Sequence, residues 1–303
     1  MISLKRISSY FRKSFNKVKD RDYKVGRFVI KLPYSHNLPE YQSSFKNYDK
    51  KLGCIINSLS EKDGWIIDIG ANVGDTAALL RTYSDLSICC IEGDSLFSDY
   101  LKANCQQMDG VTVVNKYVSG RNTEHGNFTV DRKNGTAVLL DSGNNSSSVQ
   151  METLENIFVN LNINCDKIRL LKSDTDGFDF DILLSNKAMI KEFRMPLYFE
   201  YDIMYRDNDR NDSIELVTFL SSLGYKFVVY DNFGNLLTCI SEGAPERFNY
   251  LNNYLLSCNV NRGGVNYFDV FAAVSQDVVD FVTDNDNKKI IGNTMKNVNV
   301  KFL

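Results

Sequence analysis

Hydrophobic and polar positions along the middle of the chain follow the rhythm of a parallel α/β sheet. Short apolar runs, typical of strands buried on both faces, alternate with segments of helical periodicity. We interpret as parallel strands the runs 65–69, 87–91, 111–117, 168–172 and 197–201. Helices are predicted between them over 75–82, 95–108, 153–159 and 180–193. Strand–helix–strand units of this kind predict right-handed crossovers and a doubly wound, mostly parallel sheet.

The flanking segments complete an α/β fold. Further strands are predicted at 28–32 and 267–274, helices at 48–59 and 214–223, and a loop over 34–48. An inserted β-hairpin is predicted over 126–141, because Asn134-Gly135 is a strong signal for a tight turn. A second hairpin is predicted from 225–230 and 236–240. No linker or internal repeat interrupts the pattern, so we expect one domain over 34–275.

Composition narrows the class of protein. The 303 residues, 43% of them hydrophobic with only 4 Pro, can bury a full core, which excludes a fibrous or mostly disordered chain. No apolar run reaches the length of a spanning helix, and the first 30 residues do not resemble a secretory signal. Seven cysteines without a CxxC pair predict free thiols in the cytoplasm. With only two histidines and no Cys/His cluster, we predict no structural zinc site.

The net charge of −3 hides an asymmetry between the start of the chain and the rest. Residues 1–31 carry a balance of +8 and the remainder −11. The first 18 residues have apolar positions at helical spacing and predict a basic amphipathic helix, within an N-terminal extension over 1–33. This helix either packs on its own acidic domain, is a solvated tail, or binds a polyanion or the cytoplasmic face of a membrane. Residues 276–303 are interpreted as a C-terminal tail.

The most informative motif is a glycine turn between the first parallel strand and its helix. Gly70 follows the strand, and Glu92 closes the next one, which suits a nucleoside whose ribose diol binds an acid. A dinucleotide motif needs glycine where this chain has Asn72. Asp68 and Asp75 would also repel a pyrophosphate, by about 1–4 kcal/mol for a unit pair at about 4 Å. These carboxylates would attract the ammonium and sulfonium of S-adenosylmethionine, which is therefore the favoured cofactor.

Two further groups of acids follow later strands. Asp174 and Asp176 come directly after the run 168–172, and Glu200 lies at the end of the next strand. Because ligands of open α/β sheets bind outside the carboxyl ends of strands, these acids should lie at the edge that carries Gly70. They could take a proton from a substrate hydroxyl or hold a divalent cation. The alternative is structural, an Asx turn and helix cap after the strand and a solvated strand end.

Taken together, these stretches resemble the FkbM-type family of S-adenosylmethionine-dependent methyltransferases. The resemblance covers roughly residues 34–275 and is carried by the stretches "IIDIGANVGDTAAL", "SSSVQMETLENIF", "LLKSDTDGFDFDIL" and "PLYFEYD". Glu155 stands where the family more often has aspartate. The upstream stretch "SHNLPEYQSSFKNYDKKL" resembles one branch of the family.

The resemblance implies a class I methyltransferase fold with a seven-strand sheet and O-methylation of hydroxyls on sugars, surface polysaccharides or secondary metabolites. It implies no nucleic-acid partner and leaves the oligomeric state open. The residues implied to hold the cofactor are Asp68, Gly70, Asn72, Gly74, Asp75 and Glu92. The candidate bases, in order of preference, are Asp174 or Asp176, then Glu200, then His36. Two alternatives stay open, an NAD-dependent sugar oxidoreductase or epimerase and a non-catalytic module that binds a membrane or a polyanion.

Overall fold

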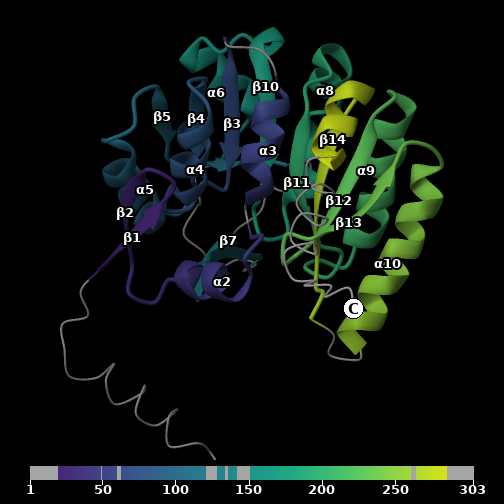
Figure 1. Cartoon of the computed structure of the whole chain (residues 1–303), viewed down its shortest axis with the longest axis horizontal. Coiled ribbons are helices and arrows are strands. Elements are labelled where there is room, and N and C mark those ends of the chain that lie inside the picture. The colour runs from purple at the N-terminus through teal and green to yellow at the C-terminus, as the bar shows by residue number, and fades with distance from the viewer. Residues whose placement is uncertain are drawn as a thin grey trace, which may run out of the picture.

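The computed structural model describes residues 20–48, 50–59, 63–120, 128–133, 136–141, 151–260 and 264–284. A mixed eight-stranded sheet forms its centre, with helices on both faces (Figure 1). In spatial order the strands are β13 (Leu236–Ile240), β12 (Lys226–Asp231), β14 (Phe268–Ala273), β11 (Leu197–Tyr201), β10 (Ile168–Ser173), β3 (Trp65–Ile69), β4 (Ser87–Ile91) and β5 (Val111–Val114).

The strand order reverses beside β3. From β3 the chain moves outward through β4 to β5 and then returns to β10 on the other side, and all of these neighbours are parallel. β14 lies antiparallel between β11 and β12. The doubly wound, mostly parallel sheet is thus confirmed, and β13 adds an eighth strand through the predicted second hairpin. A reversal of this kind opens a crevice at the carboxyl ends of the strands.

One face of the sheet packs on the helices that follow the first strands. This face carries α3 (Lys50–Ser58), α4 (Asp75–Tyr83) and α5 (Ser95–Cys105). The antiparallel pair β1 (Arg21–Val25) and β2 (Phe28–Leu32) and the helical residues 276–284 pack there too. Ile30 and Val282, fully buried in this core, lie in segments that we assigned from sequence to the extension and the tail. The packed unit therefore reaches beyond 34–275 at both ends.

The opposite face is covered by the helices of the second half of the chain. They are α6 (Leu154–Leu161), α7 (Asp179–Ser185), α8 (Lys187–Phe193), α9 (Asp209–Ser222) and α10 (Ala244–Val260), with a 3-10 turn at Cys165–Lys167. Side chains of each strand alternate between the two cores, so Ile67 faces this one while its neighbour Ile66 faces α3 and α4.

Smaller elements lie near the carboxyl ends of the parallel strands. They are α2 (Leu38–Ser44), the hairpin strands β7 (Phe128–Lys133) and β8 (Thr136–Asp141), and the pair β6 (Tyr117–Val118) and β9 (Met151–Glu152). Figure 1 shows α2 and β7 at the same end of the molecule. The hairpin strands were predicted, but their turn at Asn134-Gly135 lies outside the described residues.

The sequence prediction differs from the structure at several elements. The run 111–117, predicted as one strand, divides into β5 and the separate strand β6, which pairs with β9, and β1 was not predicted. Residues 34–48, predicted as a loop, contain α2, which has proline in its first turn. The helix predicted over 180–193 is two helices, because Asn186 ends α7 and begins α8 with non-helical backbone angles. The 17-residue helix α10 was not predicted at all. The predicted N-terminal helix lies outside the described residues.

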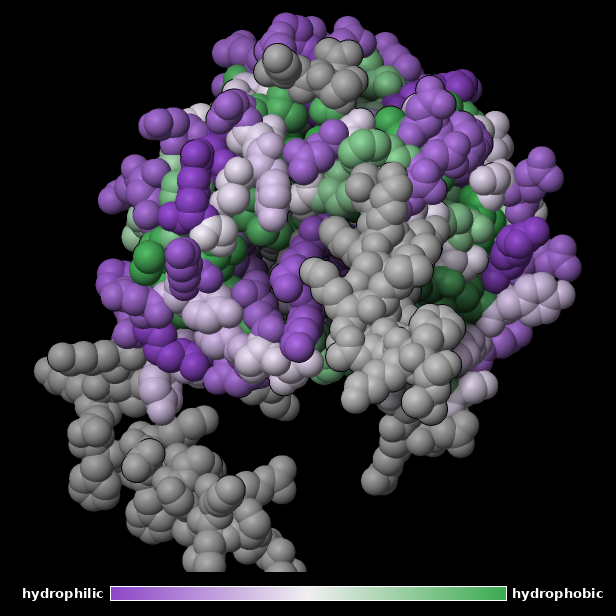
Figure 2. Space-filling view, in the orientation of Figure 1, coloured by the Kyte–Doolittle hydropathy of each residue, from purple (hydrophilic) through white to green (hydrophobic). Residues whose placement is uncertain are grey.

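None of the helices in the described part of the chain is long and apolar enough to span a membrane. On the face shown in Figure 2, hydrophilic side chains occupy most of the border, with smaller hydrophobic areas between them.

Candidate active site

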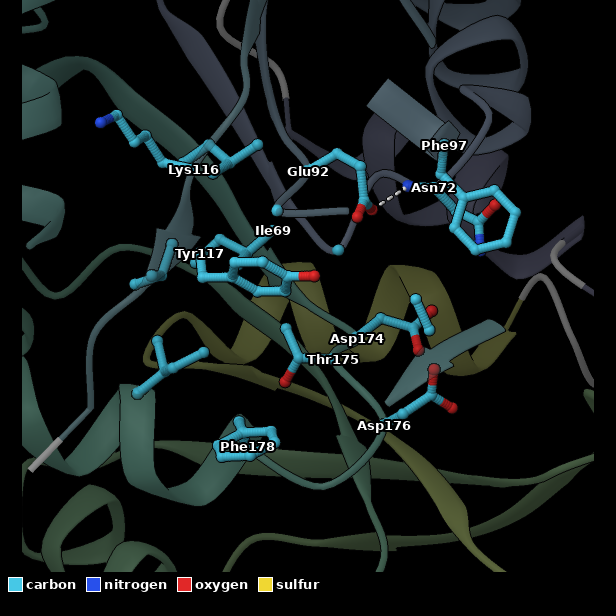
Figure 3. A pocket seen from close by; sticks show the side chains of 16 residues that line it. Ile69, Asn72, Glu92, Phe97, Lys116, Tyr117, Asp174, Thr175, Asp176 and Phe178 are labelled. Atoms are coloured by element: carbon cyan, nitrogen blue, oxygen red, sulfur yellow. Dashed lines mark hydrogen bonds between the residues drawn. The ribbon is translucent and has the colours of Figure 1, made fainter. Parts of the chain in front are cut away.

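A pocket opens at the carboxyl ends of β3, β4 and β10, beside the reversal of strand order (Figure 3). Segments far apart in the sequence form its wall, including the glycine turn, the end of β4, β6, β8 and the loop after β10. The lining residues are Ile69, Gly70, Asn72, Ile91, Glu92, Gly93, Phe97, Lys116, Tyr117, Val118, Ala137, Asp174, Thr175, Asp176, Phe178 and Ile182. The pocket therefore brings together five residues that the sequence predicted for the cofactor and catalytic sets. They are Gly70, Asn72, Glu92, Asp174 and Asp176.

Gly70 allows two loops of the site to meet. Its backbone is left-handed, with φ +76°, and a Cβ there would lie 1.8 Å from the carbonyl oxygen of Asp174. The amide N of Asp174 donates to the carbonyl of Ile69 at 3.0 Å. Glycine is thus required for the approach of the loop after β10, in addition to any approach by a ligand. Gly74 lies outside the pocket, and a Cβ there would meet Leu101 of α5 at 2.8 Å.

Asn72 and Glu92 form the polar end of the pocket. The amide N of Asn72 donates to Glu92 Oε2 at 2.8 Å, and the amide N of Asp94 donates to Oε1 at 2.7 Å (Figure 3). Burial raises the pKa of Glu92 to about 7, against the opposing effect of these two hydrogen bonds. The carboxyl group is consequently held in place and changes its charge close to neutral pH.

His36 supports Asn72 from behind. The amide N of Leu38 donates to His36 Nδ1 at 3.2 Å, and Nε2 lies 3.2 Å from Asn72 Oδ1. Since a backbone N–H can only donate, Nδ1 is the acceptor and Nε2 carries the proton towards the amide oxygen. Both ring nitrogens are engaged, and His36 is not among the residues that line the pocket. This arrangement fits a positioning role better than that of a base.

Asp68 lies beneath the pocket rather than in its wall. Its side chain is fully buried on the α3 side of β3, and Lys172 Nζ lies 3.0 Å from its Oδ1. The same ammonium lies 3.2 Å from Asp174 Oδ2. Burial raises the pKa of Asp68, and the adjacent ammonium opposes that rise. Lys172 therefore links a buried acid of β3 to an acid of the pocket.

Asp75 also lies behind the pocket, at the first residue of α4. Burial raises its pKa, and the charge of Lys172 opposes this. Neither Asp68 nor Asp75 is positioned in the wall where a ligand of this pocket would touch it.

Asp176 stands at the rim with a strained backbone and a perturbed carboxyl group. Its φ of +50° is unusual for a residue other than glycine. Burial, followed by the charge of Asp174, raises the pKa of Asp176 to about 7. The hydroxyl of Tyr205 donates to Asp176 Oδ1 at 3.0 Å and opposes that rise. A carboxyl group with this pKa suits proton transfer near neutral pH.

The structural role that we considered for Asp174 and Asp176 belongs to Asp179. Its Oδ1 accepts a hydrogen bond from Ser173 Oγ at 2.5 Å, and its Oδ2 accepts from the amide N of Thr175 at 3.3 Å. Asp179 thereby closes the loop 173–179 and leaves Asp174 and Asp176 directed at the pocket (Figure 3).

Glu200 lies near the end of β11 with only 7% of its surface exposed. Burial raises its pKa well above the ordinary value, and the charges of Asp174 and Asp176 raise it further. Glu200 does not line the pocket.

The apolar and aromatic walls of the pocket were not predicted. Phe97 of α5, Tyr117 of β6 and Phe178 form much of them. The hydroxyl of Tyr117 is buried without a hydrogen-bond partner among the described residues, and Figure 3 shows it pointing towards the middle of the pocket. The sequence signal for the position of this ring is Gly93. A Cβ at that residue would lie 2.2 Å from Tyr117 Cδ1, so only glycine leaves room for the ring.

The pocket combines features that suit a nucleoside with a cationic end. It has apolar walls for a base, the carboxyl group of Glu92 for ribose hydroxyls, and Asp174 and Asp176 for a positive charge. The unsatisfied hydroxyl of Tyr117 offers a further partner for a polar ligand. Within the described ranges, no group of three or more His, Cys, Asp or Glu side chains is arranged to hold a metal ion.

The sheet, with β14 antiparallel between β11 and β12 and the pocket at its reversal point, has the class I methyltransferase fold. Residues 68–227, more than half of the chain, match the sequence model of the methyltransferase FkbM domain. The chain belongs to the FkbM family of methyltransferases. The methyl donor of this family is S-adenosylmethionine, and the pocket residues fit it.

Comparisons with individual proteins give only distant similarity. No curated protein matches the sequence. Among solved structures, the chain is similar to M. jannaschii TYW2 in complex with AdoMet, with 14% identity, 85% of this chain and 87% of that chain covered, and a TM-score of 0.39. It is similar to methyltransferase FkbM from Methylobacillus flagellatus KT, with 16% identity, 67% and 58% covered, and a TM-score of 0.39. An rRNA methylase from Streptococcus thermophilus shares 10% identity over 73% and 93%, with a TM-score of 0.41.

Proposed function

We propose that this methyltransferase is an O-methyltransferase that acts on a hydroxyl group, on a sugar or a surface polysaccharide. The observation that carries the proposal is the position of Asp176. Its carboxyl group lies in the wall of the cofactor pocket, with a pKa raised to about 7 and one oxygen held by Tyr205. An alcohol loses its proton as it is methylated, and a carboxylate so placed can accept that proton.

Within this proposal the cofactor lies along the glycine turn. The backbone of Gly70 and Asn72 and the carboxyl group of Glu92 would hold its ribose, and Tyr117 and Phe178 would flank its base. Asp68, Gly74 and Asp75, which were predicted as cofactor residues, would not contact the cofactor and would support the residues that line the pocket.

The chemistry assigns separate tasks to the acids. Bound S-adenosylmethionine supplies an electrophilic methyl group. Asp176 takes the proton of the acceptor hydroxyl, while Lys172 holds Asp174 in place at 3.2 Å. Holding acceptor and donor in line supplies a further large part of the acceleration.

The two alternatives from the sequence receive less support. An NAD-dependent enzyme is disfavoured because the match over residues 68–227 is to a methyltransferase model. A non-catalytic binding module would not use the raised pKa values of the pocket acids Glu92 and Asp176. None of the seven cysteines, all of which lie in the described residues, forms a disulfide. We place the protein in the cytoplasm.

Calorimetry and labelled-methyl transfer test the proposal together. We expect S-adenosylhomocysteine to bind and NAD not to bind. Transfer of labelled methyl groups into fractionated extract of the source cell should then identify the acceptor, and NMR of the product should show a methyl ether. An N-methyl or C-methyl product would contradict O-methylation.

Asp176→Asn should reduce methyl transfer by about 10²-fold or more, the usual contribution of a positioned base, with affinity for S-adenosylhomocysteine within about threefold of wild type. Asp174→Asn and Glu200→Gln are the matched variants of the other candidate acids. Full turnover by Asp176→Asn would remove it from the mechanism.

A further inference from the structure

Tyr205 connects the loop after β11 to the loop after β10. Its hydroxyl donates a hydrogen bond to Asp176 Oδ1 at 3.0 Å. Its side chain also packs over Gly177, where a Cβ would lie 2.5 Å from Tyr205 Cβ. The phenol is thus fixed relative to Asp176 at both of its ends, although 42% of the residue is exposed.

The neighbouring residue anchors the same loop. The guanidinium of Arg206 lies 4.9 Å from the centre of the Phe178 ring and 3.7 Å from Asp181 Oδ2. Its amide N and its Nε both donate to Asp209 at the start of α9. The backbone on the carboxyl side of Tyr205 is therefore tied to α7 and α9, so the direction of the phenol is set by the fold.

The surroundings of Asp176 are otherwise acidic. The charged groups that face it are Asp174 from its own loop, Asp179 from α7, Glu200 and Asp202 from β11 and the loop beyond, and Glu92 from the end of β4. Lys172 of β10 is already paired with Asp68 and Asp174. Among the hydrogen bonds of the described residues, that from Tyr205 stabilises the ionised form of Asp176.

We propose that Tyr205 is a positioning residue for methyl transfer, which fixes Oδ1 of Asp176 and presents Oδ2 to the hydroxyl of the acceptor. The inference rests on the proposed function of Asp176. As the acceptor oxygen bonds to the methyl carbon, the bond from that carbon to sulfur breaks and the hydroxyl proton passes to Oδ2. Tyr205 keeps its own proton and its hydrogen bond throughout.

The test removes one oxygen atom, the hydroxyl oxygen of Tyr205. Tyr205→Phe keeps the ring over Gly177 and removes the donor. Tyr250→Phe is the matched control, because Tyr250 is exposed on α10 and its hydroxyl donates to another carboxylate, Glu246 Oε1, at 3.2 Å. Two quantities are measured in each variant: the pKa of Asp176, from carboxyl ¹³C NMR assigned with Asp176→Asn, and the pH profile of kcat/KM.

In Tyr205→Phe we expect the pKa of Asp176 to rise by about one unit, the size of effect that a hydrogen bond to a charged group has. The acid limb of kcat/KM should move upward by the same amount. Activity should then fall about fivefold at pH 7 and stay within about twofold of wild type at pH 9, as the ionised fractions for pKa values of about 7 and about 8 require. Tyr250→Phe should match wild type in both measurements.

Three outcomes are decisive. An unchanged Asp176 pKa in Tyr205→Phe overturns the inference, and so does an equal loss of activity at every pH, which would indicate a merely structural role. If the wild-type protein transfers no methyl group, the proposed function fails, while the NMR titration still decides whether Tyr205 controls Asp176.

Discussion

The pairing of Asp68 with Lys172 makes a prediction about stability that can be worked out in numbers. At 3.0 Å, and with an effective dielectric constant of about 20, the two charges attract each other by about 5 kcal/mol. The second pair of this lysine, with the 45% exposed side chain of Asp174, contributes no more than about 1 kcal/mol. Lys172→Met therefore acts mainly by leaving the carboxylate of Asp68 buried without a cation.

The carboxyl group can escape that penalty by binding a proton. Relative to an unfolded pKa of about 3.9, protonation costs about 4 kcal/mol at pH 7 and about 1.5 kcal/mol at pH 5. We therefore expect Lys172→Met to lose about 3–4 kcal/mol at pH 7, in the range found for broken buried pairs, and about 2 kcal/mol less at pH 5. The sign follows from linkage: the folded pKa lies above the unfolded one, so stability falls as pH rises from about 4.

Urea unfolding of the protein without cofactor measures these differences. Trp65, the one tryptophan of the chain, lies on the same strand as Asp68 and reports by fluorescence, and far-UV circular dichroism checks that both transitions coincide. The double variant Asp68→Asn/Lys172→Met is the control, since it removes both charges and should recover about 2 kcal/mol of the loss. A loss below about 1 kcal/mol at pH 7, or an equal loss at pH 5, would refute the reasoning.

Three other variants test the walls of the cofactor pocket. Wild-type affinity for S-adenosylmethionine should rise between pH 6 and pH 8 as Glu92, with its pKa of about 7, becomes charged, and calorimetry of Glu92→Gln should show a flat and weaker profile. Gly70→Ala should destabilise the protein by about 2 kcal/mol more than Gly74→Ala in urea unfolding, because its Cβ meets the carbonyl of Asp174 rather than a flexible leucine. Arg132 of β7 donates from Nε and Nη2 to Asp94 Oδ2, at 2.7 and 2.6 Å. Arg132→Ala removes this link between the hairpin and the pocket and should weaken binding of S-adenosylhomocysteine about threefold to tenfold. The exposed Asp131 on the same strand is its control, and equal affinities of Arg132→Ala and Asp131→Ala would contradict a role for the hairpin.

The central strands could be predicted from sequence because each is an apolar run that breaks at a turn. β3, β4 and β11 begin and end at the predicted residues. Helix α10 escaped prediction because a polar residue occupies its buried face: Asn252 is fully buried and accepts a hydrogen bond from the hydroxyl of Tyr201 at 2.8 Å. Because Tyr201 belongs to β11, the hydrophobic periodicity of α10 alone cannot show that Asn252 has a buried partner. Helix α2 buries only Leu38 and so shows no apolar stripe.

For the site, the sequence located the edge of the sheet but not the direction of each side chain. Gly70, Glu92 and Asp176 meet in one pocket, as their positions after parallel strands predicted. Asp68 was assigned to the same group, yet alternation along β3 turns it to the opposite face from Ile67 and Ile69. The rings of Phe97 and Tyr117 reach the pocket from α5 and β6, and their directions depend on packing between distant segments.

The buried carboxyl groups of this edge divide into two sets according to their partners. Asp68 and Asp269 each face a buried lysine, Lys172 and Lys51 respectively, and both pairs lie on the α3 side of the sheet. Glu92 and Asp176 have no lysine within ion-pairing distance among the described residues, and their pKa values rise to about 7.

The fold thus accommodates many acids at one edge by giving some a cation and leaving others partly protonated. The acids of the second set gain a counter-charge only when a cationic ligand occupies the pocket. Binding of the positively charged methyl donor should lower the pKa of Asp176 and convert it to the carboxylate that the proposed reaction needs. The base would then become competent in the complex rather than in the free protein. This coupling gives a physical reason for building the pocket from acids without lysine partners instead of from acids that are paired with a lysine.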